Sequence, residues 1–298
     1  MFENVLVGVD GGGGGRDAIA LARQLGGERA RYLLMNVVSR PALVRGAAIW
    51  LAASCRYAEE LLERERSETG IAAQLATGCD RSPARALHVR ALREGSDLVV
   101  VGASHRNHLL RLLLGDDAIA TVDGSPCAIA VAPSGYRDRP GAWTTIAVGD
   151  DGSPQSARAL DVARGLSSYH HAAIEAVSVI GPENLSYREL VLPDWSPAAD
   201  RLADSRQAQL NATRGVHGRV LHGDAVDVLA DLSDEVDLLI VGTRGQGRLG
   251  RLINGSTARR LAARTRCPLV ILPSVTRAAA AELDGPSPDP HPRSARRS

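Results

Sequence analysis

The chain contains no lysine, because all 35 of its basic residues are arginine. This absence excludes a Walker A phosphate loop, which ends in GK[ST], and a kinase that depends on a strand lysine. It also excludes Schiff-base chemistry on lysine, including the usual attachment of pyridoxal phosphate. A protein of this composition that handles a nucleotide must therefore hold it by another device.

Aromatic residues are also scarce, at 3% of the chain, and the formal net charge is only +1. Rows of base-stacking rings and a strongly basic surface are both missing, so we expect no nucleic-acid partner. No uninterrupted run of 18 apolar residues occurs, and the first ten residues do not have the pattern of a signal peptide. We therefore expect a cytoplasmic protein without a membrane partner.

The four cysteines stand apart and form no CxxC pair: Cys55, Cys79, Cys127 and Cys267. This spacing fits small buried side chains in a reducing compartment, and it excludes a zinc or disulfide framework. The hydrophobic fraction of 44% is typical of a globular protein, and 298 residues suggest two domains.

Internal repetition defines those two domains. SDLVVVGASH (96–105) matches VDLLIVGTRG (236–245), and DGGGGGRDAIALAR (10–23) matches DGSPQSARALDVAR (151–164). We expect a first copy at 1–134, a second copy at 143–275, a short polar join at 134–142 and a disordered tail at 276–298.

Each copy alternates short apolar runs with amphipathic stretches, which predicts an α/β fold with a doubly wound parallel sheet of five strands. The first three strands of each copy are expected at 5–9, 31–38 and 71–76, and at 144–149, 172–179 and 218–222. Helices are expected near 16–26, 52–69 and 83–94, and near 154–167, 197–213 and 225–235. The fourth and fifth strands follow the last of these helices in each copy, and the fourth strand of the second copy is expected to end at Gly242.

The second copy carries a glycine pattern after its fourth strand. GTRGQGRLGRLINGST has the spacing G-x2-G-x9-G-[ST], with Gly242, Gly245, Gly255 and Ser256 at its fixed positions. Glycines allow the backbone to approach a phosphate closely, and a following helix offers free N–H groups to an anion. This spacing predicts a phosphate site at the carboxyl edge of the sheet.

With VDGG and DDGS closing the two first strands, and VGTRGQGRLGRLINGSTARRLAARTRCPLVILP in the second copy, the chain resembles a tandem universal stress protein of the actinobacterial type. The resemblance covers about residues 1–275. It implies the adenine nucleotide alpha-hydrolase-like fold with sheet order 3-2-1-4-5, and pairing of copies through their fifth strands, within one chain or in a homodimer. It further implies ATP binding without established turnover, and a role in stress survival or dormancy.

Residue by residue, the resemblance places Asp151 and Gly152 beside adenosine and Ser178 at adenine through its backbone. Ribose and triphosphate would be held by Gly242, Thr243, Arg244, Gly245, Gln246, Gly247, Arg248, Gly255, Ser256 and Thr257. Mg²⁺ or Mn²⁺ would accompany the phosphates, which supply ligands themselves. The first copy keeps weaker candidates, namely Asp10, Gly11, Val37, Gly102 and Gly115.

The first copy departs from the pattern at His105, which replaces the second glycine, and at Asp116, where the family has Ser or Thr. An aspartate there caps its own helix and repels phosphate. Two unit charges about 4 Å apart cost about 4 kcal/mol at intermediate dielectric, whereas a charged hydrogen bond returns about 1.5–3 kcal/mol. We therefore expect weak or absent ATP binding in the first copy.

Three other features suggest no site. The run Gly11–Gly15 lies at the wrong strand for a phosphate loop and fits a flexible first turn better. His105 and His108 are more typical of polar loop residues than of metal ligands, so we assign no metal site. His170 and His171 are expected at a strand start, where adjacent side chains point to opposite faces.

No nucleophile with an orienting base is evident, so we predict no enzymatic activity and no catalytic residue. The leading hypothesis is an ATP-binding, non-catalytic regulator that presents a surface to an unidentified protein partner. One alternative is an interaction module that works without nucleotide. The other is a slow ATPase or adenylyl transferase.

Overall fold

The computed structural model describes residues 1–39, 47–103, 127–139, 141–181, 196–242 and 260–273. In the first copy the elements are β1 (Asn4–Gly8), α1 (Gly13–Gly26), β2 (Arg31–Ser39), α2 (Ala47–Thr69), β3 (Ala73–Asp80), α3 (Pro83–Glu94), β4 (Leu98–Gly102) and β5 (Ala128–Ala132). After the short 3-10 helix η1 (Tyr136–Asp138), the second copy has β6 (Thr145–Gly149), α6 (Pro154–His170), β7 (Ala173–Ile180), α8 (Ser196–Asn211), β8 (His217–His222), α9 (Ala225–Leu232), β9 (Leu238–Gly242) and β10 (Leu269–Leu272).

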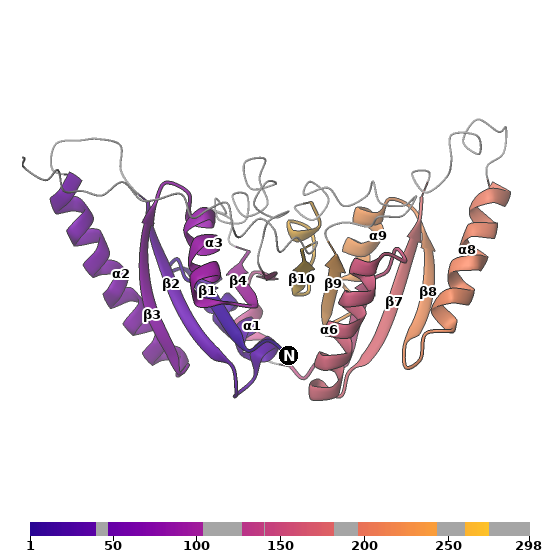
Figure 1. Cartoon of the computed structure of the whole chain (residues 1–298), viewed down its shortest axis with the longest axis horizontal. Coiled ribbons are helices and arrows are strands. Elements are labelled where there is room, and N and C mark those ends of the chain that lie inside the picture. The colour runs from indigo at the N-terminus through magenta and orange to yellow at the C-terminus, as the bar shows by residue number, and fades with distance from the viewer. Residues whose placement is uncertain (40–46, 104–126, 140, 182–195, 243–259, 274–298) are drawn as a thin grey trace, which may run out of the picture.

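One continuous sheet runs through both copies, in the order β3-β2-β1-β4-β5-β10-β9-β6-β7-β8. Each half has the expected order 3-2-1-4-5, and its strands pair in parallel. The halves join where β10 pairs with β5 in antiparallel register, with Val270 opposite Ala130. Figure 1 shows the resulting arrangement, with α2 and α8 at the two ends of the molecule. The predicted fold class and the pairing of fifth strands are confirmed.

Helices cover both faces of the sheet, as the alternating strand residues require. Val5 and Val7 of β1 pack in one cluster with apolar residues of α1, α2 and α6, while Leu6 packs on the other face with those of α3. Both clusters continue through the second copy. Among the described residues no helix is both long and apolar enough to cross a membrane.

The glycine run is only partly a turn, which corrects our expectation, because Gly13, Gly14 and Gly15 lie inside α1. Gly12 is the N-cap and Gly13 begins the helix, three residues before the predicted start. Gly14 is buried against Gly102, because a Cβ on Gly102 would overlap the Gly14 carbonyl oxygen. A Cβ on Gly15 would lie 3.1 Å from Val9 Cγ1. The run therefore allows the helix to start in close contact with the ends of two strands.

The polar join is also more ordered than its composition suggests. Asp17 of α1 accepts hydrogen bonds from the backbone N–H groups of Gly135 (2.9 Å) and Arg137 (3.0 Å). Tyr136 is buried, donates its hydroxyl hydrogen to Gln24 and accepts from Trp143 Nε1 at 3.1 Å. Burial raises the pKa of Tyr136 to about 12, so its hydroxyl stays protonated at neutral pH. These contacts fix the join to the first copy.

His170 takes part in the same contact region. It is the last residue of α6, and His171 is the left-handed C-cap, so the pair does not lie at a strand start as we had expected. His170 Nε2 lies 2.9 Å from the backbone carbonyl oxygen of Gln24, and its ring lies 4.3 Å from the Trp143 ring. The second copy thus contacts α1 of the first copy directly.

Candidate functional site

The carboxyl end of β6 leads into α6 through a tight turn that the first copy repeats. Gly152 has φ +77° and Gly11 has φ +79°, a region that favours glycine. Asp151 Oδ1 accepts from Ser153 N at 3.0 Å, and Asp10 Oδ1 accepts from Gly12 N at 2.9 Å. The predicted residues Asp151 and Gly152 are therefore the structural counterparts of Asp10 and Gly11, and both pairs shape the turn.

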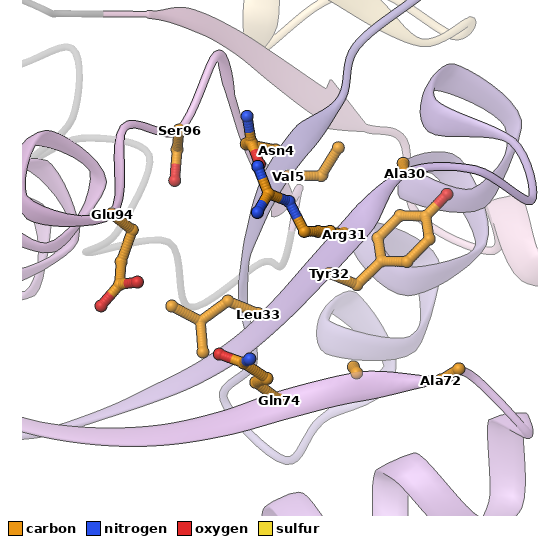
Figure 2. A pocket seen from close by; sticks show the side chains of 11 residues that line it. Asn4, Val5, Ala30, Arg31, Tyr32, Leu33, Ala72, Gln74, Glu94 and Ser96 are labelled. Atoms are coloured by element: carbon orange, nitrogen blue, oxygen red, sulfur yellow. The ribbon is translucent and has the colours of Figure 1, made fainter.

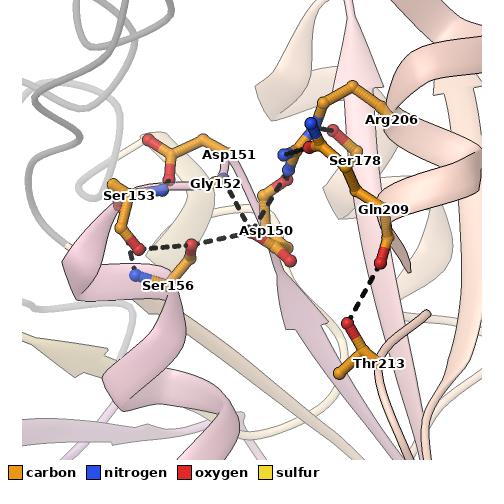
Figure 3. Close-up of polar contacts among 9 residues, drawn as sticks. All are labelled: Asp150, Asp151, Gly152, Ser153, Ser156, Ser178, Arg206, Gln209 and Thr213. Carbon is orange, nitrogen blue, oxygen red and sulfur yellow. Dashed lines mark hydrogen bonds and ion pairs between the residues drawn. The ribbon is translucent and has the colours of Figure 1, made fainter. Parts of the chain in front are cut away.

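The residue before this turn in the second copy, Asp150, is held by several donors (Figure 3). Its Oδ1 accepts from Ser156 Oγ at 2.7 Å, from Gly152 N at 2.7 Å and from Arg206 Nη2 at 3.2 Å. The side chains of Asp150 and Arg206 are only 11% and 9% exposed, so this is a largely buried ion pair. We call Asp150, Gly152, Ser156, Ser178 and Arg206 the switch-point cluster, because they lie at the carboxyl ends of the strands where the strand order of the sheet reverses.

Arg206 reaches the cluster from α8 and joins three elements. Its Nε donates to Ser178 Oγ at 3.2 Å, and its Nη2 also donates to the Asp150 carbonyl oxygen at 3.0 Å. A Cβ on Gly152 would lie 2.5 Å from Arg206 Nη1, so the guanidinium covers the turn. The hydroxyl of Ser178, a residue we predicted to contact adenine through its backbone, is thus already occupied by arginine.

In the first copy, apolar side chains lie at the turn after β1, where the second copy has Asp150 and Arg206. Val9 follows β1 as Asp150 follows β6, and its N–H bonds to β2 as that of Asp150 bonds to β7. A Cβ on Gly11 would meet Leu61 of α2, where Gly152 faces Arg206. The strand registers pair Gly8 with Met35 and Gly149 with Val177, so the counterpart of Ser178 is Asn36 and not the neighbouring Val37. Asn36 Nδ2 donates to the Val9 carbonyl oxygen at 2.7 Å, the role that Arg206 has in the second copy.

Sequence reasoning missed the Asp150–Arg206 pair. The visible signal was the doublet Asp150-Asp151, where the first copy has Val9-Asp10. A carboxylate replacing a buried valine requires a partner, because an unpaired buried charge is costly. That requirement pointed to an arginine, although not to Arg206 in particular.

The fourth strands end at glycines in both copies. Gly242 is the last residue of β9, and a Cβ on it would lie 2.8 Å from Gln155 Cβ, at the start of α6. Gly102 ends β4 against Gly14, the residue that corresponds to Gln155. Within the part of the chain that the structure describes, the buried Gln155 Oε1 has no hydrogen-bond partner.

The rest of the predicted phosphate loop lies outside the described residues: Thr243, Arg244, Gly245, Gln246, Gly247, Arg248, Gly255, Ser256 and Thr257. The same holds in the first copy for Gly115 and for His105, His108 and Asp116. Among the residues that are described, no three His, Cys, Asp or Glu side chains are placed to hold a metal ion.

A cavity of about 440 Å³ lies in the first copy at the opposite edge of the sheet (Figure 2). It is lined by residues at the amino ends of strands, among them Asn4, Arg31 and Ala73. Ligands of open parallel sheets bind beyond the carboxyl ends of strands, so this cavity is separate from the candidate site.

Comparison with known proteins agrees with this geometry. A model of the universal stress protein family matches residues 1–133 and again residues 142–273. The chain belongs to the universal stress protein family. Both matches include a first-strand turn and a fourth strand ending in glycine.

The alignments with curated relatives each cover a length similar to that of one copy. Universal stress protein Rv1996 of Mycobacterium tuberculosis is 27% identical over 156 residues, which is 45% of this chain and 49% of that protein. Universal stress protein Rv2623 of the same species is 32% identical over 139 residues, 43% of this chain and 46% of that protein. The chain thus spans about half the length of these curated relatives.

Solved structures match nearly the whole chain. A universal stress protein from Archaeoglobus fulgidus has a TM-score of 0.62 at 14% identity, covering 91% of this chain and 96% of that one. A putative universal stress protein from Pseudomonas aeruginosa has a TM-score of 0.55 at 17% identity, covering 91% and 93%. At these identities the likeness establishes the fold.

Proposed function

We propose that this protein is a cytoplasmic, non-catalytic stress regulator that binds ATP in its second copy. The observation that carries the proposal is the intact G-x2-G-x9-G-[ST] pattern of a universal stress protein, which starts at Gly242. Gly242 ends β9 at the carboxyl edge of the sheet, next to the turn that contains Asp151 and Gly152. Strands β6 and β9 are neighbours in the sheet. The residues proposed to lie beside adenosine and those proposed to hold the phosphates therefore lie next to one another at the carboxyl ends of these strands.

Different residues along this edge of the sheet are proposed to hold different parts of the nucleotide. Asp151 and Gly152 would lie beside adenosine, while Gly242, Gly245, Gly255 and Ser256 would hold ribose and triphosphate, with Mg²⁺ on the phosphates. Glycines in this pattern act through backbone N–H groups, which suits a chain without lysine. Nucleotide binding would change a surface at this edge of the sheet that a protein partner recognises.

We propose that the first copy contributes packing rather than a second ATP site. The charge argument at Asp116 supports this, and so does the apolar set formed by Val9 and Leu61 at its switch point. Since β5 and β10 already pair within the chain, a homodimer would have to use another surface.

Equilibrium binding of ATP to nucleotide-stripped protein tests the proposal. We expect saturable binding that weakens at least tenfold in Gly245→Ala and in Gly255→Ala, since a Cβ keeps the backbone from the phosphates. The matched control is Gly115→Ala at the corresponding point of the first copy, which should leave the affinity unchanged. Unaltered affinity in both second-copy variants would contradict the proposal, and absence of ATP binding would favour an interaction module that needs no nucleotide.

A further inference from the structure

The cavity of about 440 Å³ at the amino edge of the first copy lies between the sheet and the end of α3 (Figure 2). Its volume falls in the range of about 300–1,000 Å³ that is usual for small-molecule sites. Its walls come from the amino ends of β1, β2 and β3 and from the residues at the end of α3. Every residue that lines it belongs to the described part of the chain, and exposed side chains at its rim leave it open to solvent.

The second copy carries three charged side chains at the corresponding place. Arg219 Nη1 lies 3.1 Å from Glu235 Oε2 and 3.4 Å from Glu175 Oε1. By strand register and by the internal repeat, the first copy has Leu33 in place of Glu175, Ala76 in place of Arg219 and Gly95 in place of Glu235. The first copy therefore leaves room where the second copy has an ion-pair network.

Opposite charges reach this cavity from two of its walls. Arg31 lies on β2 two residues before Leu33, so the two side chains project from the same face of the sheet. Glu94 is the last residue of α3, and the C-terminal end of a helix itself favours a positive charge. Glu94 pairs with Arg90 at 2.9 Å, whereas Arg31 forms no ion pair in the described part of the chain. The cavity thus offers a cation and an anion that do not neutralise each other.

Neutral side chains line the cavity between the two charges. Leu33 supplies apolar surface and is 7% exposed. Gln74 is paired with Leu33 in the register of β2 and β3, and Figure 2 shows the two side chains next to each other. Asn4 of β1 and Ser96 after α3 add further hydrogen-bonding groups. A few polar groups around an apolar surface are typical of small-molecule sites.

From this arrangement we infer that the cavity is a second ligand site, which binds a small zwitterion of the amino-acid class. The carboxylate of the ligand pairs with Arg31, its ammonium group pairs with Glu94, and its apolar side chain packs on Leu33. A guanidinium group matches a carboxylate in both charge and geometry. A zwitterion meets both walls at once, whereas an anion or a cation meets only one. This site lies at the opposite edge of the sheet from the proposed nucleotide site and does not depend on ATP.

Titration of the full chain with L-leucine, followed through its amide NMR signals, tests the inference. We expect saturable shifts at the amino ends of β1, β2 and β3 at leucine concentrations up to about 10 mM. N-acetyl-L-leucine lacks the ammonium group and L-leucinamide lacks the carboxylate. Each analogue should bind about three- to tenfold more weakly than leucine, because it loses one solvent-exposed charge contact.

Charge variants assign each contact to its residue. Arg31→Gln should remove the preference for leucine over leucinamide, and Glu94→Gln should remove the preference for leucine over N-acetyl-leucine. The matched controls are Arg29→Gln and Glu28→Gln, which change exposed residues of the turn before β2 that do not line the cavity. Both controls should keep both preferences.

Filling the cavity gives a test that does not rest on a single charge. Leu33→Glu combined with Ala76→Arg introduces two members of the ion-pair network of the second copy, and this variant should lose leucine binding. Its melting temperature and the spread of its amide signals report whether it still folds, and the two charge variants test the inference where it does not.

Four results would overturn the inference. They are no saturable shift with leucine, shifts confined to other parts of the protein, equal affinity for leucine and either analogue, and preferences that persist in Arg31→Gln and Glu94→Gln. Equal affinity for N-acetyl-leucine would identify an anion site, and equal affinity for leucinamide a cation site. ATP affinity should stay unchanged in all of these variants, so a failure here leaves the proposed function standing.

Discussion

The two copies share one backbone at the switch point but fill it with opposite chemistry. The first copy places Val9 and Leu61 around its turn, and the second places Asp150 and Arg206 around the same turn. Asn36 supports the strand-end carbonyl in one copy, and Arg206 does so in the other. A duplicated fold thus tolerates either an apolar pair or an ion pair there, provided both members change together.

This comparison also shows which part of the fold is under strict constraint. The positive-φ glycine and the aspartate that accepts from the backbone N–H two residues ahead are the same in both copies. The N-cap differs, because Ser153 accepts from Ser156 N through its side chain and Gly12 has no side chain. Side chains that cover the turn differ. The turn is therefore set by backbone geometry, and the covering residues are free to specialise.

The largest effect is expected when one partner of the ion pair is removed. Arg206→Leu leaves the Asp150 carboxylate buried without its cation and should lower the free energy of unfolding by about 3–5 kcal/mol. Urea denaturation of the full chain measures this.

The matched control converts the whole set to that of the first copy. Asp150→Val, Ser156→Gly, Ser178→Asn and Arg206→Leu together reproduce Val9, Gly15, Asn36 and Leu61. This variant should recover most of the lost stability. If the fourfold variant is less stable than Arg206→Leu alone, the equivalence of the two sets is wrong.

A smaller effect is expected from alanine at the turn glycines. Gly70 has φ +63°, and an added Cβ would meet open space. Gly70→Ala therefore measures backbone strain alone and should lower the free energy of unfolding by about 1–2 kcal/mol. Gly11→Ala should cost more, because the Cβ would also displace the buried Leu61. Gly152→Ala should fall between them, since the end of the Arg206 side chain can shift. Equal unfolding midpoints for all three would contradict the packing described.

The smallest effect is a pH dependence at the amino edge of β6. Burial opposes ionisation of Asp237, but hydrogen bonds from the Thr144 and Thr145 backbone N–H groups and the Thr144 hydroxyl outweigh it and lower the Asp237 pKa below its ordinary value of 3.8. The unfolded chain therefore binds this proton more readily. The resulting stability is fully present above about pH 4 and is lost as pH falls through the lower folded-state pKa.

Asp237→Asn should flatten the fall of the unfolding free energy between about pH 4 and pH 2. Asp231→Asn, on the exposed side of α9, removes one charge without touching these donors and is the matched control. A slope that Asp237→Asn leaves unchanged would show that the Thr144 contacts do not select the ionised form.

The sequence predicted the parts of the fold that depend on local pattern. Apolar runs marked the central strands, because buried parallel strands must be apolar on both faces. The pairing of the fifth strands was implied by the resemblance to universal stress proteins. It did not predict the start of α1, because a glycine run has low helix propensity and only contact with Gly102 explains it.

The site was less accessible to sequence reasoning for two reasons. The Asp150–Arg206 pair joins residues 56 positions apart, and the register of α8 against β6 decides which arginine arrives. A shift of one residue between β2 and β7 made Asn36, and not Val37, the counterpart of Ser178. Both features arise from tertiary packing, which periodicity in one chain does not report.

The most direct test of the account is the number of ATP molecules bound per chain. Calorimetric titration of nucleotide-stripped protein with ATP and Mg²⁺, beside Gly255→Ala, measures it. We predict a stoichiometry near one that is lost in the variant, because only the second copy carries the intact glycine pattern. A stoichiometry near two, or one site that survives in Gly255→Ala, would contradict the division of roles between the copies.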